Sequence, residues 1–307
     1  MFGVLNLNKP AGVTSRDCVN VVQRLVRPVK VGHAGTLDPM ATGVLLVSVG
    51  PATKLISLLQ QQAKTYAAGF RLGVTSDTDD STGSIIEEAQ AAPVDREVVE
   101  RTLQRFVGRI EQVPPAFSAV KVNGRRAYSK ARKGEDFQLT ARPVDVYRVE
   151  LTSYHWPDLE VTIKCGTGTY IRSIARDLGQ ALGCGGLMTG LERTAIGSFT
   201  TETAITPDDL NAENLSDLLH DPLDVLNFLP VRCCSEAERI NIRRGRRIEL
   251  GTIMQPEADS PHNDRKANDI VLLASTDRTQ LLAVATLTED GKQLQPRNVF
   301  DREPSRS

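Results

Sequence analysis

Hydrophobic and polar positions alternate in short runs along much of the chain, and between these runs apolar residues recur at helical spacing. Alternation with a period of two is typical of half-buried strands, and apolar residues three and four positions apart indicate amphipathic helices. The pattern predicts strands over residues 2–8, 43–49, 64–73, 117–122, 144–151, 159–165 and 186–193. It predicts helices over residues 15–27, 52–62, 94–107, 126–133 and 170–182.

The irregular order of these elements, together with several hairpin signals, favours an α+β fold over a doubly wound parallel one. The expected core is a mixed, largely antiparallel sheet. A domain boundary is expected near residue 228, because Pro222, Asn227 and Pro230 interrupt an acidic stretch there. Residues 1–228 then form the first domain.

The remainder of the chain predicts a small β-rich domain over residues 229–300. An arginine-rich helix and a turn at Gly251 precede two β-rich runs, 270–274 and 281–287. The polar insert 255–269 and the tail 301–307 are expected to be disordered, because their composition offers little apolar surface to bury.

Charge is balanced overall but unevenly distributed. The 307 residues carry 37 Lys and Arg against 38 Asp and Glu, a net charge of −1, which is unusual for a nucleic-acid-binding protein. Basic residues nevertheless gather over 121–148 and 239–247, while the acidic stretches 77–100 and 202–224 are expected to face away from a phosphate backbone. The alternative is that these runs are solvated faces of a mixed surface.

Cysteine usage and the amino terminus add few constraints. The cysteines are odd in number and form no Cys-x-x-Cys pair, so the sequence indicates neither a disulfide framework nor a zinc site; they are Cys18, Cys165, Cys184, Cys233 and Cys234. The chain shows no signal-peptide pattern and no apolar run of membrane-spanning length. A cytoplasmic protein without a metal site or membrane association is therefore expected.

The most informative segment runs from Gly32 to Gly43 and reads GHAGTLDPMATG. Its glycines allow the backbone to approach a ligand closely, and the apolar strand that follows would hold His33 and Asp38 in place. In isolation the segment has a simpler explanation, since Asp-Pro and Gly pairs are common in turns where the aspartate bonds its own backbone.

Four further segments support the functional reading. Lys9-Pro10-x-Gly12-x-Thr14-Ser15 ends a strand and begins a helix, and Tyr66 lies near the start of another predicted strand. Pro114-Pro115-x-x-Ser118-Ala119-x-Lys121 leads into an Asn-Gly turn flanked by arginines. Gly168-Thr169-Tyr170-Ile171-Arg172 joins a strand to a helix.

In this order and spacing, the five segments resemble the motifs of the TruB family of bacterial tRNA pseudouridine-55 synthases, over roughly two thirds of the chain. The resemblance implies isomerisation of uridine to pseudouridine at position 55 in the tRNA T loop. In that reaction the base flips out, its N-glycosidic bond breaks, and a carbon–carbon bond to the ribose replaces it. The resemblance further implies a central mixed sheet split by a cleft, followed by a PUA-like RNA-binding tail.

Carried over residue by residue, the resemblance makes Asp38 the catalytic aspartate and Arg172 the arginine paired with it. It places His33 beside the flipped nucleotide and Tyr66 against the target base. Tyr170 and Leu191 become further contacts of the base. RNA-backbone contacts are expected from basic residues in and near the motifs, namely Lys9, Lys121, Arg125 and Arg126.

The chemistry independently requires groups of these kinds. An extruded base is held by stacking and by hydrogen bonds to its edge, as an aromatic such as Tyr66 could provide. Glycosidic cleavage requires a nucleophile or a carboxylate that stabilises positive charge, and an arginine would keep Asp38 ionised and aimed. The sequence leaves open whether Asp38 attacks ribose C1′ or uracil C6. Each residue also has a structural reading, as a backbone-bonded histidine, core aromatic or leucine, or surface arginine.

Two features bear on substrate and partners. The turn Cys165-Gly166-Thr167-Gly168 lacks the Ser-Lys pair common in the family, which removes one expected phosphate contact. The guide-RNA-dependent archaeal and eukaryotic branch is a related alternative, but the chain has no clear long carboxy-terminal RNA-binding module. The expected partner is therefore the T-arm of tRNA, bound by a monomer without guide RNA or cofactor.

Two alternatives lie outside this enzyme class. One is a non-catalytic RNA-binding or RNA-folding factor, although such a protein would have no need of a carboxylate facing polyanionic RNA. The other is a nucleoside hydrolase, which usually requires a positioned water or a metal. Analysis of the RNA product separates the three, because the base is isomerised, unchanged or released.

Overall fold

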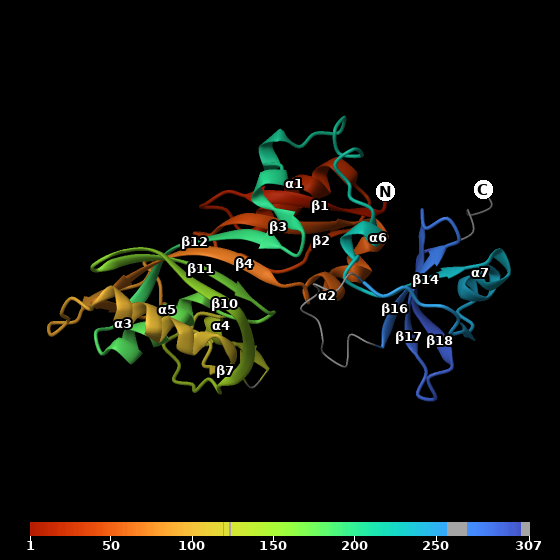
Figure 1. Ribbon diagram of the computed structural model, residues 1–307. Helices are drawn as coiled ribbons and strands as arrows, with labels where there is room; N and C mark the ends of the chain where they lie inside the picture. Colours follow the sequence, from red (N-terminus) through yellow and green to blue (C-terminus); the bar gives the residue numbers. More distant parts are fainter. Residues whose placement is uncertain (119, 123, 257–268, 302–307) are drawn as a thin grey trace.

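The chain forms two principal β-sheets that pack against each other through a shared apolar core (Figure 1). The computed structural model describes residues 1–118, 120–122, 124–256 and 269–301. Disorder was predicted for the insert 255–269 and the tail 301–307, and most of these residues, 257–268 and 302–307, lie outside the described ones.

The larger sheet is mixed and mostly antiparallel, which confirms the predicted fold class. Two short strands flank its main path, where β2 (Val31–His33) pairs with β3 and β13 (Phe199–Thr200) pairs with β12. Along the main path the order is β1 (Gly3–Lys9), β3 (Thr42–Val49), β12 (Gly186–Ile196), β4 (Lys64–Leu72), β11 (Asp158–Cys165), β10 (Arg142–His155) and β7 (Gly108–Gln112).

One parallel junction joins the two halves of this sheet. Strands β3 and β12 pair only through Thr42 with Glu192 and Gly43 with Arg193. Gly43 has φ +100°, and a Cβ atom there would lie 2.3 Å from the carbonyl oxygen of Arg193, so only glycine fits. The junction therefore brings the loop before β3 against β12.

Helices cover the two halves separately, and each buries an apolar stripe. Helix α1 (Ser15–Val26), which begins with a Thr14–Asp17 capping box, packs on β1 and β3. Helices α5 (Ile171–Leu182) and α3 (Arg96–Leu103) share a second core with β4, β10 and β11. Shorter helical segments are η1 (Gly50–Leu55), α2 (Ile56–Leu59), η2 (Gln104–Phe106), α4 (Ala127–Ala131), η3 (Thr201–Thr203), η4 (Pro207–Asp209) and α6 (Pro222–Val225).

The second sheet confirms the expected β-rich carboxy-terminal region. It also carries α7 (Glu236–Arg243), the predicted arginine-rich helix, which begins with a Ser235–Glu238 capping box. The strand order is β14 (Val231–Cys234), β16 (Ile270–Ser275), β17 (Leu281–Leu287), β18 (Gln293–Val299) and β15 (Ile248–Glu249).

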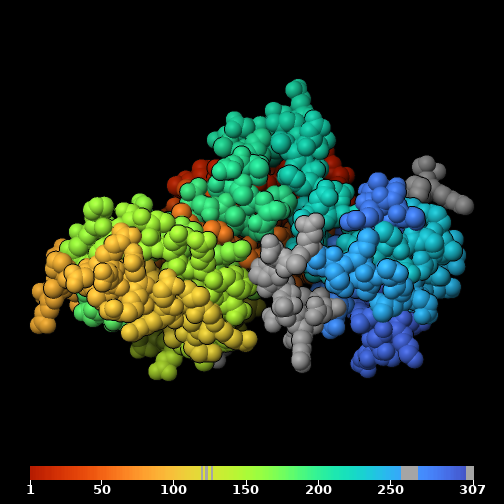
Figure 2. Space-filling view, viewed as in Figure 1, coloured from red at the N-terminus to blue at the C-terminus, as the bar shows by residue number. Residues whose placement is uncertain are grey.

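The two sheets do not have independent cores. Val44 of the first sheet and Leu272 of the second belong to one buried cluster, which also contains Leu226 from the connecting segment. Phe2 and Phe300 stack beside it with ring centroids 5.0 Å apart. In Figure 2 the carboxy-terminal part, coloured cyan to blue, lies directly against the preceding teal segment. Separating the sheets would expose this apolar surface.

Several elements depart from the sequence pattern. Among the described residues of the strand predicted over 117–122, only Lys121 and Val122 form a strand, β8 (Lys121–Val122), which pairs with β9 (Arg125–Arg126). The carbonyls of Ser118 and Val120 accept hydrogen bonds from the first amides of α4, so they are not available to a sheet. The pattern also missed short strands, including β2, β7, β5 (Val74–Ser76) and β6 (Ile85–Glu87).

Candidate active site

Asp38 lies in a tight loop that several hydrogen bonds hold next to the start of α1. The amide of Ala41 donates to the Asp38 carbonyl, and the Gly12 amide donates to the Pro39 carbonyl. Ser15 bonds both the amide and the carbonyl of Leu37 through its hydroxyl group. These contacts fix the loop from both sides, while the Asp38 side chain stays 41% exposed.

Lys9 supports this loop from below and has a different role from the one predicted. It is fully buried, and its ammonium group donates to the carbonyls of Pro10, Val13 and Pro39. Burial lowers its pKa, although the nearby Asp38 opposes the shift. An ammonium group enclosed in this way cannot reach a phosphate, so the predicted RNA-backbone contact of Lys9 is wrong.

Arg172 reaches Asp38 from the first turn of α5. One guanidinium nitrogen lies 3.1 Å from Oδ2 of Asp38, and the other lies 3.3 Å from Oδ2 of Asp80. The same two nitrogens donate to the carbonyls of Phe117 and Thr78. With only 6% of Arg172 exposed, the guanidinium is held in one orientation and presents a fixed positive charge to Asp38.

Asp80 is a residue that the sequence reasoning missed. It was counted within the acidic stretch 77–100 expected to face away from RNA, but it is 4% exposed and turns towards Arg172. Its neighbour Asp79 likewise pairs with Arg176 of α5 at 2.8 Å. The sequence did contain a signal for these contacts. Arg172 and Arg176 lie one helical turn apart, so they could be expected to pair with two adjacent aspartates.

A cavity of about 380 Å³ opens beside the Asp38–Arg172 pair. Its volume lies within the range of small-ligand pockets. The structure brings five predicted residues to its walls from four different parts of the chain; they are Asp38, Tyr66, Tyr170, Arg172 and Leu191. Lys64 and Arg193, which the sequence reasoning did not select, also line it.

Tyr66 forms part of the cavity wall through its position on β4. Arg193 lies opposite Tyr66 on the neighbouring strand β12. Its guanidinium bonds the Tyr66 side chain and donates to the carbonyls of Val44 and Gly35. Burial raises the pKa of Tyr66 and outweighs the opposing effect of Arg193. The phenol is therefore neutral at physiological pH, and Arg193 ties it to the Asp38 loop.

Tyr170 is positioned by its backbone and by a stacked guanidinium. Its amide and carbonyl both bond the side-chain amide of Gln112. The guanidinium of Arg142 lies 5.1 Å from the Tyr170 ring centroid and donates to the Gly168 carbonyl at 2.8 Å. Arg142 thus rigidifies the turn that lacks the family's Ser-Lys pair.

His33 and the basic hairpin lie outside the cavity walls. His33 ends β2, and its Nδ1 atom is buried without a hydrogen-bond partner among the described residues. Burial lowers the pKa of His33, so the neutral imidazole is favoured. Lys121 and Arg125 are exposed on the β8–β9 hairpin, which follows the cavity-lining residues Phe117 and Ser118; Arg126 occupies the same hairpin.

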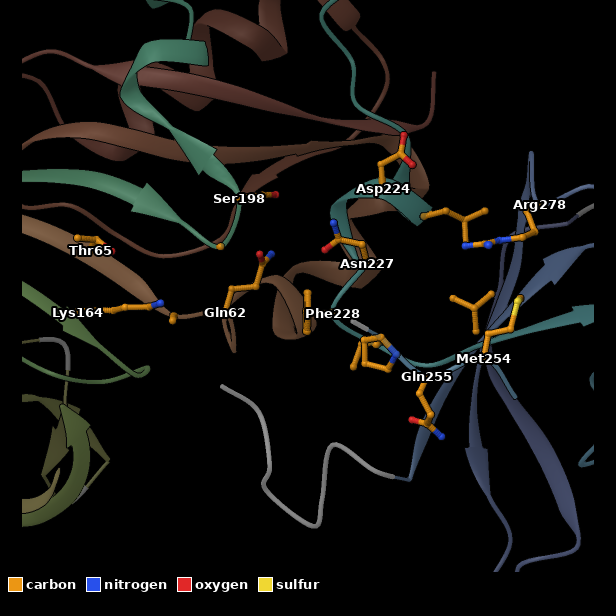
Figure 3. Close-up of a pocket in the computed structure, with 16 residues that line it drawn as sticks. Gln62, Thr65, Lys164, Ser198, Asp224, Asn227, Phe228, Met254, Gln255 and Arg278 are labelled. Carbon is orange, nitrogen blue, oxygen red and sulfur yellow. The ribbon is translucent and has the colours of Figure 1, made fainter. Parts of the chain in front are cut away.

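A larger cavity of about 630 Å³ lies between the two sheets (Figure 3). Lys164 and Thr65 line it from the first sheet, whereas Met254 and Arg278 line it from the carboxy-terminal region. The carboxylate–arginine pair does not line this cavity. We therefore place the chemistry in the smaller one, where a carboxylate, an arginine and two tyrosines converge.

The described part of the chain lacks a membrane-spanning helix and a metal-binding cluster. None of its helices has the length and apolar composition needed to cross a membrane. Nor does any group of three His, Cys, Asp or Glu side chains there have an arrangement suited to a metal ion.

Comparison with known proteins defines the class. Residues 23–171 match the TruB family pseudouridylate synthase (N-terminal domain), and residues 172–225 match the tRNA pseudouridylate synthase B C-terminal domain. The structure is similar to the crystal structure of a Cbf5-Nop10-Gar1 complex, with a TM-score of 0.75 and 26% identity over 98% of this chain and 85% of that chain. The matched domains and the fold are those of a pseudouridylate synthase.

Curated relatives narrow this class. The tRNA pseudouridine synthase B of Arthrobacter sp. is 42% identical over 87% of this chain and 89% of its own length. The enzyme of Prochlorococcus marinus is 37% identical over 98% of this chain and 97% of its own length. The enzyme of Acaryochloris marina is 46% identical over 73% of this chain and 78% of its own length. The chain belongs to the TruB family.

Proposed function

We propose that this enzyme isomerises uridine 55 in the T loop of tRNA. The observation that carries the proposal is the Asp38 carboxylate, fixed by Arg172 at the wall of a base-sized cavity lined by two tyrosines. The relatives named tRNA pseudouridine synthase B, at 37–46% identity, support tRNA as the substrate.

In the proposed reaction the target nucleotide leaves the T-loop stack and its uracil enters the cavity. Extrusion is required because the glycosidic bond is inaccessible within a folded loop. Tyr66 contacts the base, and Tyr170 and Leu191 complete the walls around it. We assign His33 to the space that the extruded nucleotide vacates, on the strength of its position just before the Asp38 loop.

Asp38 then acts on the bound uridine. Its carboxylate attacks either ribose C1′, which displaces uracil, or C6 of the ring, which activates the base for detachment. In both routes the base turns within the cavity and C5 bonds to C1′. The Asp38 carboxylate leaves C1′ as that bond forms, or leaves C6 afterwards, and the proton lost from C5 is balanced through water by one gained on N1. The Arg172 guanidinium keeps Asp38 ionised and oriented until it reacts.

Binding outside the cavity is proposed for the basic surfaces. Lys121, Arg125 and Arg126 lie on a hairpin next to the cavity-lining segment 117–118, where they would meet the phosphates of the T arm. We propose that residues 229–300 act as a PUA-like RNA-binding domain beside the catalytic domain 1–228. We further propose that the enzyme works in the cytoplasm as a monomer, without guide RNA or cofactor.

An assay with a single transcript tests this proposal. Purified protein is incubated with an unmodified tRNA transcript. The RNA is then digested, and its nucleosides are separated by liquid chromatography. The expected product is pseudouridine at position 55, with no free uracil released. A transcript that carries cytidine at position 55 should give no pseudouridine. Free uracil would indicate a hydrolase, unchanged RNA a binding protein, and pseudouridine from the cytidine-55 transcript a different target site.

A further inference from the structure

Lys64 is a buried cation of the cavity that the mechanism above leaves without a function. It begins β4 and lies two residues before Tyr66, so both side chains project from the same face of the strand. Lys64 lines the cavity together with Asp38 and Arg172, yet only 6% of its surface is exposed. A lysine enclosed to this extent is rare unless an anion compensates its charge.

No such anion accompanies Lys64 among the described residues. Its ammonium group donates to the carbonyl of Gln60, and no carboxylate lies within ion-pair distance of it there. The groups that act on its charge are the Arg193 guanidinium, which is repulsive, and the Cys165 thiol. Burial together with Arg193 lowers the pKa of Lys64 to about 8, so the group still carries its charge at neutral pH.

Comparison with Lys9 shows what is unusual about this arrangement. Both ammonium groups are buried, but Lys9 donates to three carbonyl oxygens, which satisfy all of its N–H groups. Lys64 has one such partner, so two of its donors remain for a ligand. Keeping an under-satisfied cation inside a protein costs free energy, which a bound negative group would offset.

The reaction proposed above produces negative charge on the base. If C1′ is attacked, the electron pair of the C1′–N1 bond stays on N1, and the uracil anion spreads its charge over O2 and O4. If C6 is attacked, the electron pair of the C5–C6 double bond moves towards O4 as an enolate. Either route requires stabilisation of an anionic uracil inside the cavity.

We propose that the ammonium group of Lys64 contacts a carbonyl oxygen of the uracil and stabilises this negative charge. The inference rests on the proposed function and assigns it an additional catalytic residue. A phosphate is the less suitable ligand, because phosphates follow the RNA backbone along the protein surface. The Asp38 side chain is 41% exposed where it meets the sugar or ring, whereas Lys64 is almost enclosed and suits the deeper end of the base.

A purely structural role of Lys64 predicts a different effect of its substitution on stability than a catalytic role does. The Gln60 carbonyl follows helix α2 directly, and a lysine that bonds such a carbonyl caps the helix. If Lys64 served only as this cap, Lys64→Met would destabilise the fold and leave the chemical step intact. A cation retained for catalysis gives an unchanged or higher Tm and a slower chemical step, because methionine removes the buried charge but keeps the apolar stem.

The test compares three full-length variants with wild type in single-turnover assays at saturating tRNA transcript. Lys64→Met is expected to lose about 100-fold in rate, with affinity for the transcript within about threefold. Lys64→Arg, which keeps a positive charge, is expected to recover at least about tenfold of that loss. Lys164→Met, on the neighbouring strand and facing the other cavity, is the matched control and should keep the wild-type rate.

A second substrate identifies the charge that Lys64 stabilises. Fluorine at C5 withdraws electrons and stabilises an anionic uracil. The rate loss caused by Lys64→Met should therefore shrink at least about threefold on a transcript that carries 5-fluorouridine at position 55. The reaction of this transcript is measured as the disappearance of 5-fluorouridine. An equal deficit on both substrates would overturn the inference. So would a wild-type rate for Lys64→Met, or no recovery in Lys64→Arg at unchanged Tm. If wild type itself fails to convert uridine, the proposed function is wrong instead.

Discussion

A guanidinium nitrogen of Arg172 lies 3.1 Å from a carboxylate oxygen of Asp38, although 133 residues of sequence separate them. The contact joins the two halves of the large sheet, since Asp38 precedes β3 and Arg172 lies in the first turn of α5. Asp80 holds the other side of the same guanidinium at 3.3 Å. The orientation of the Asp38 carboxylate therefore depends on the packing of both halves.

Asp38→Asn should abolish detectable isomerisation and leave tRNA affinity within about tenfold, or roughly 1.4 kcal/mol. Asparagine keeps the shape and can accept a bond from Arg172, but it is not an anionic nucleophile. Nucleoside analysis and filter binding measure the two effects. Asp158→Asn removes a carboxylate from an exposed pair with Arg71 and serves as the control. Turnover near the wild-type level in Asp38→Asn would refute the assignment of the catalytic residue.

Arg172→Lys should lower the single-turnover rate by about 100-fold with little change in affinity. Lysine keeps the charge, but its single nitrogen cannot pair with Asp38 and Asp80 while also bonding the Phe117 and Thr78 carbonyls. Thermal unfolding measured in parallel shows how much of the loss is structural. A wild-type rate would mean that charge alone is sufficient at this position.

The metal requirement can be tested directly. We expect protein treated exhaustively with chelator to isomerise uridine in a prefolded T-arm hairpin at an undiminished rate. The physical reason is that, in the proposed mechanism, Asp38 is the nucleophile and Arg172 supplies the compensating charge, both from the chain itself. Rates are compared with and without added Mg²⁺ on the same hairpin, so that RNA folding is held constant. Complete loss that returning the metal reverses would contradict this expectation.

The sequence predicted which residues come together better than it predicted the contacts that hold them in place. Asp38, Tyr66 and Arg172 were selected because the motifs of a known family surround them, and the structure brings all three to one cavity. Asp80 and Arg193 lie in stretches without such motifs. For Asp80 the adjacent aspartates and the two arginines of α5 were a signal, whereas the contacts of Arg193 depend on tertiary packing that no local pattern encodes.

Lys9 and the tail arginines show the same limit for charged residues. A lysine in a motif indicated phosphate binding, yet the fold surrounds its ammonium group with carbonyls. In α7, Arg239 and Arg243 pair with the buried Asp301, so they stabilise the tail. Sequence reveals where charges lie along the chain, while burial decides which of them face solvent.

The exposed arginines after α7 provide a test of RNA binding by the tail. Arg244 and Arg246 are exposed, and no side-chain partner is found for them among the described residues. Arg244→Ala with Arg246→Ala should weaken tRNA binding and reduce the slope of log K against log salt by up to about 2. Single-turnover rates at saturating RNA should not change.

Arg239→Ala is the contrasting variant, because it breaks a pair with Asp301 and should lower Tm more than the double variant does. The salt dependence of binding is measured for each variant by filter titration. An unchanged slope in the double variant would exclude this surface from RNA binding.

Acid stability of the tail should depend on the pair between Arg232 and Glu238, whose nearest atoms lie 2.5 Å apart. Hydrogen bonds from Arg232 and Ser235 lower the pKa of Glu238 from 4.5 to about 2. The carboxylate therefore contributes stability that is complete above pH 4.5 and is lost as the pH falls towards 2. The shift corresponds to at most about 3 kcal/mol. Glu238→Gln should lower the free energy of unfolding at pH 7, and its difference from wild type should narrow below pH 4. Urea titrations across this pH range measure the free energy of unfolding of both proteins. A difference that stays constant with pH would rule out this pair as the cause of the acid sensitivity.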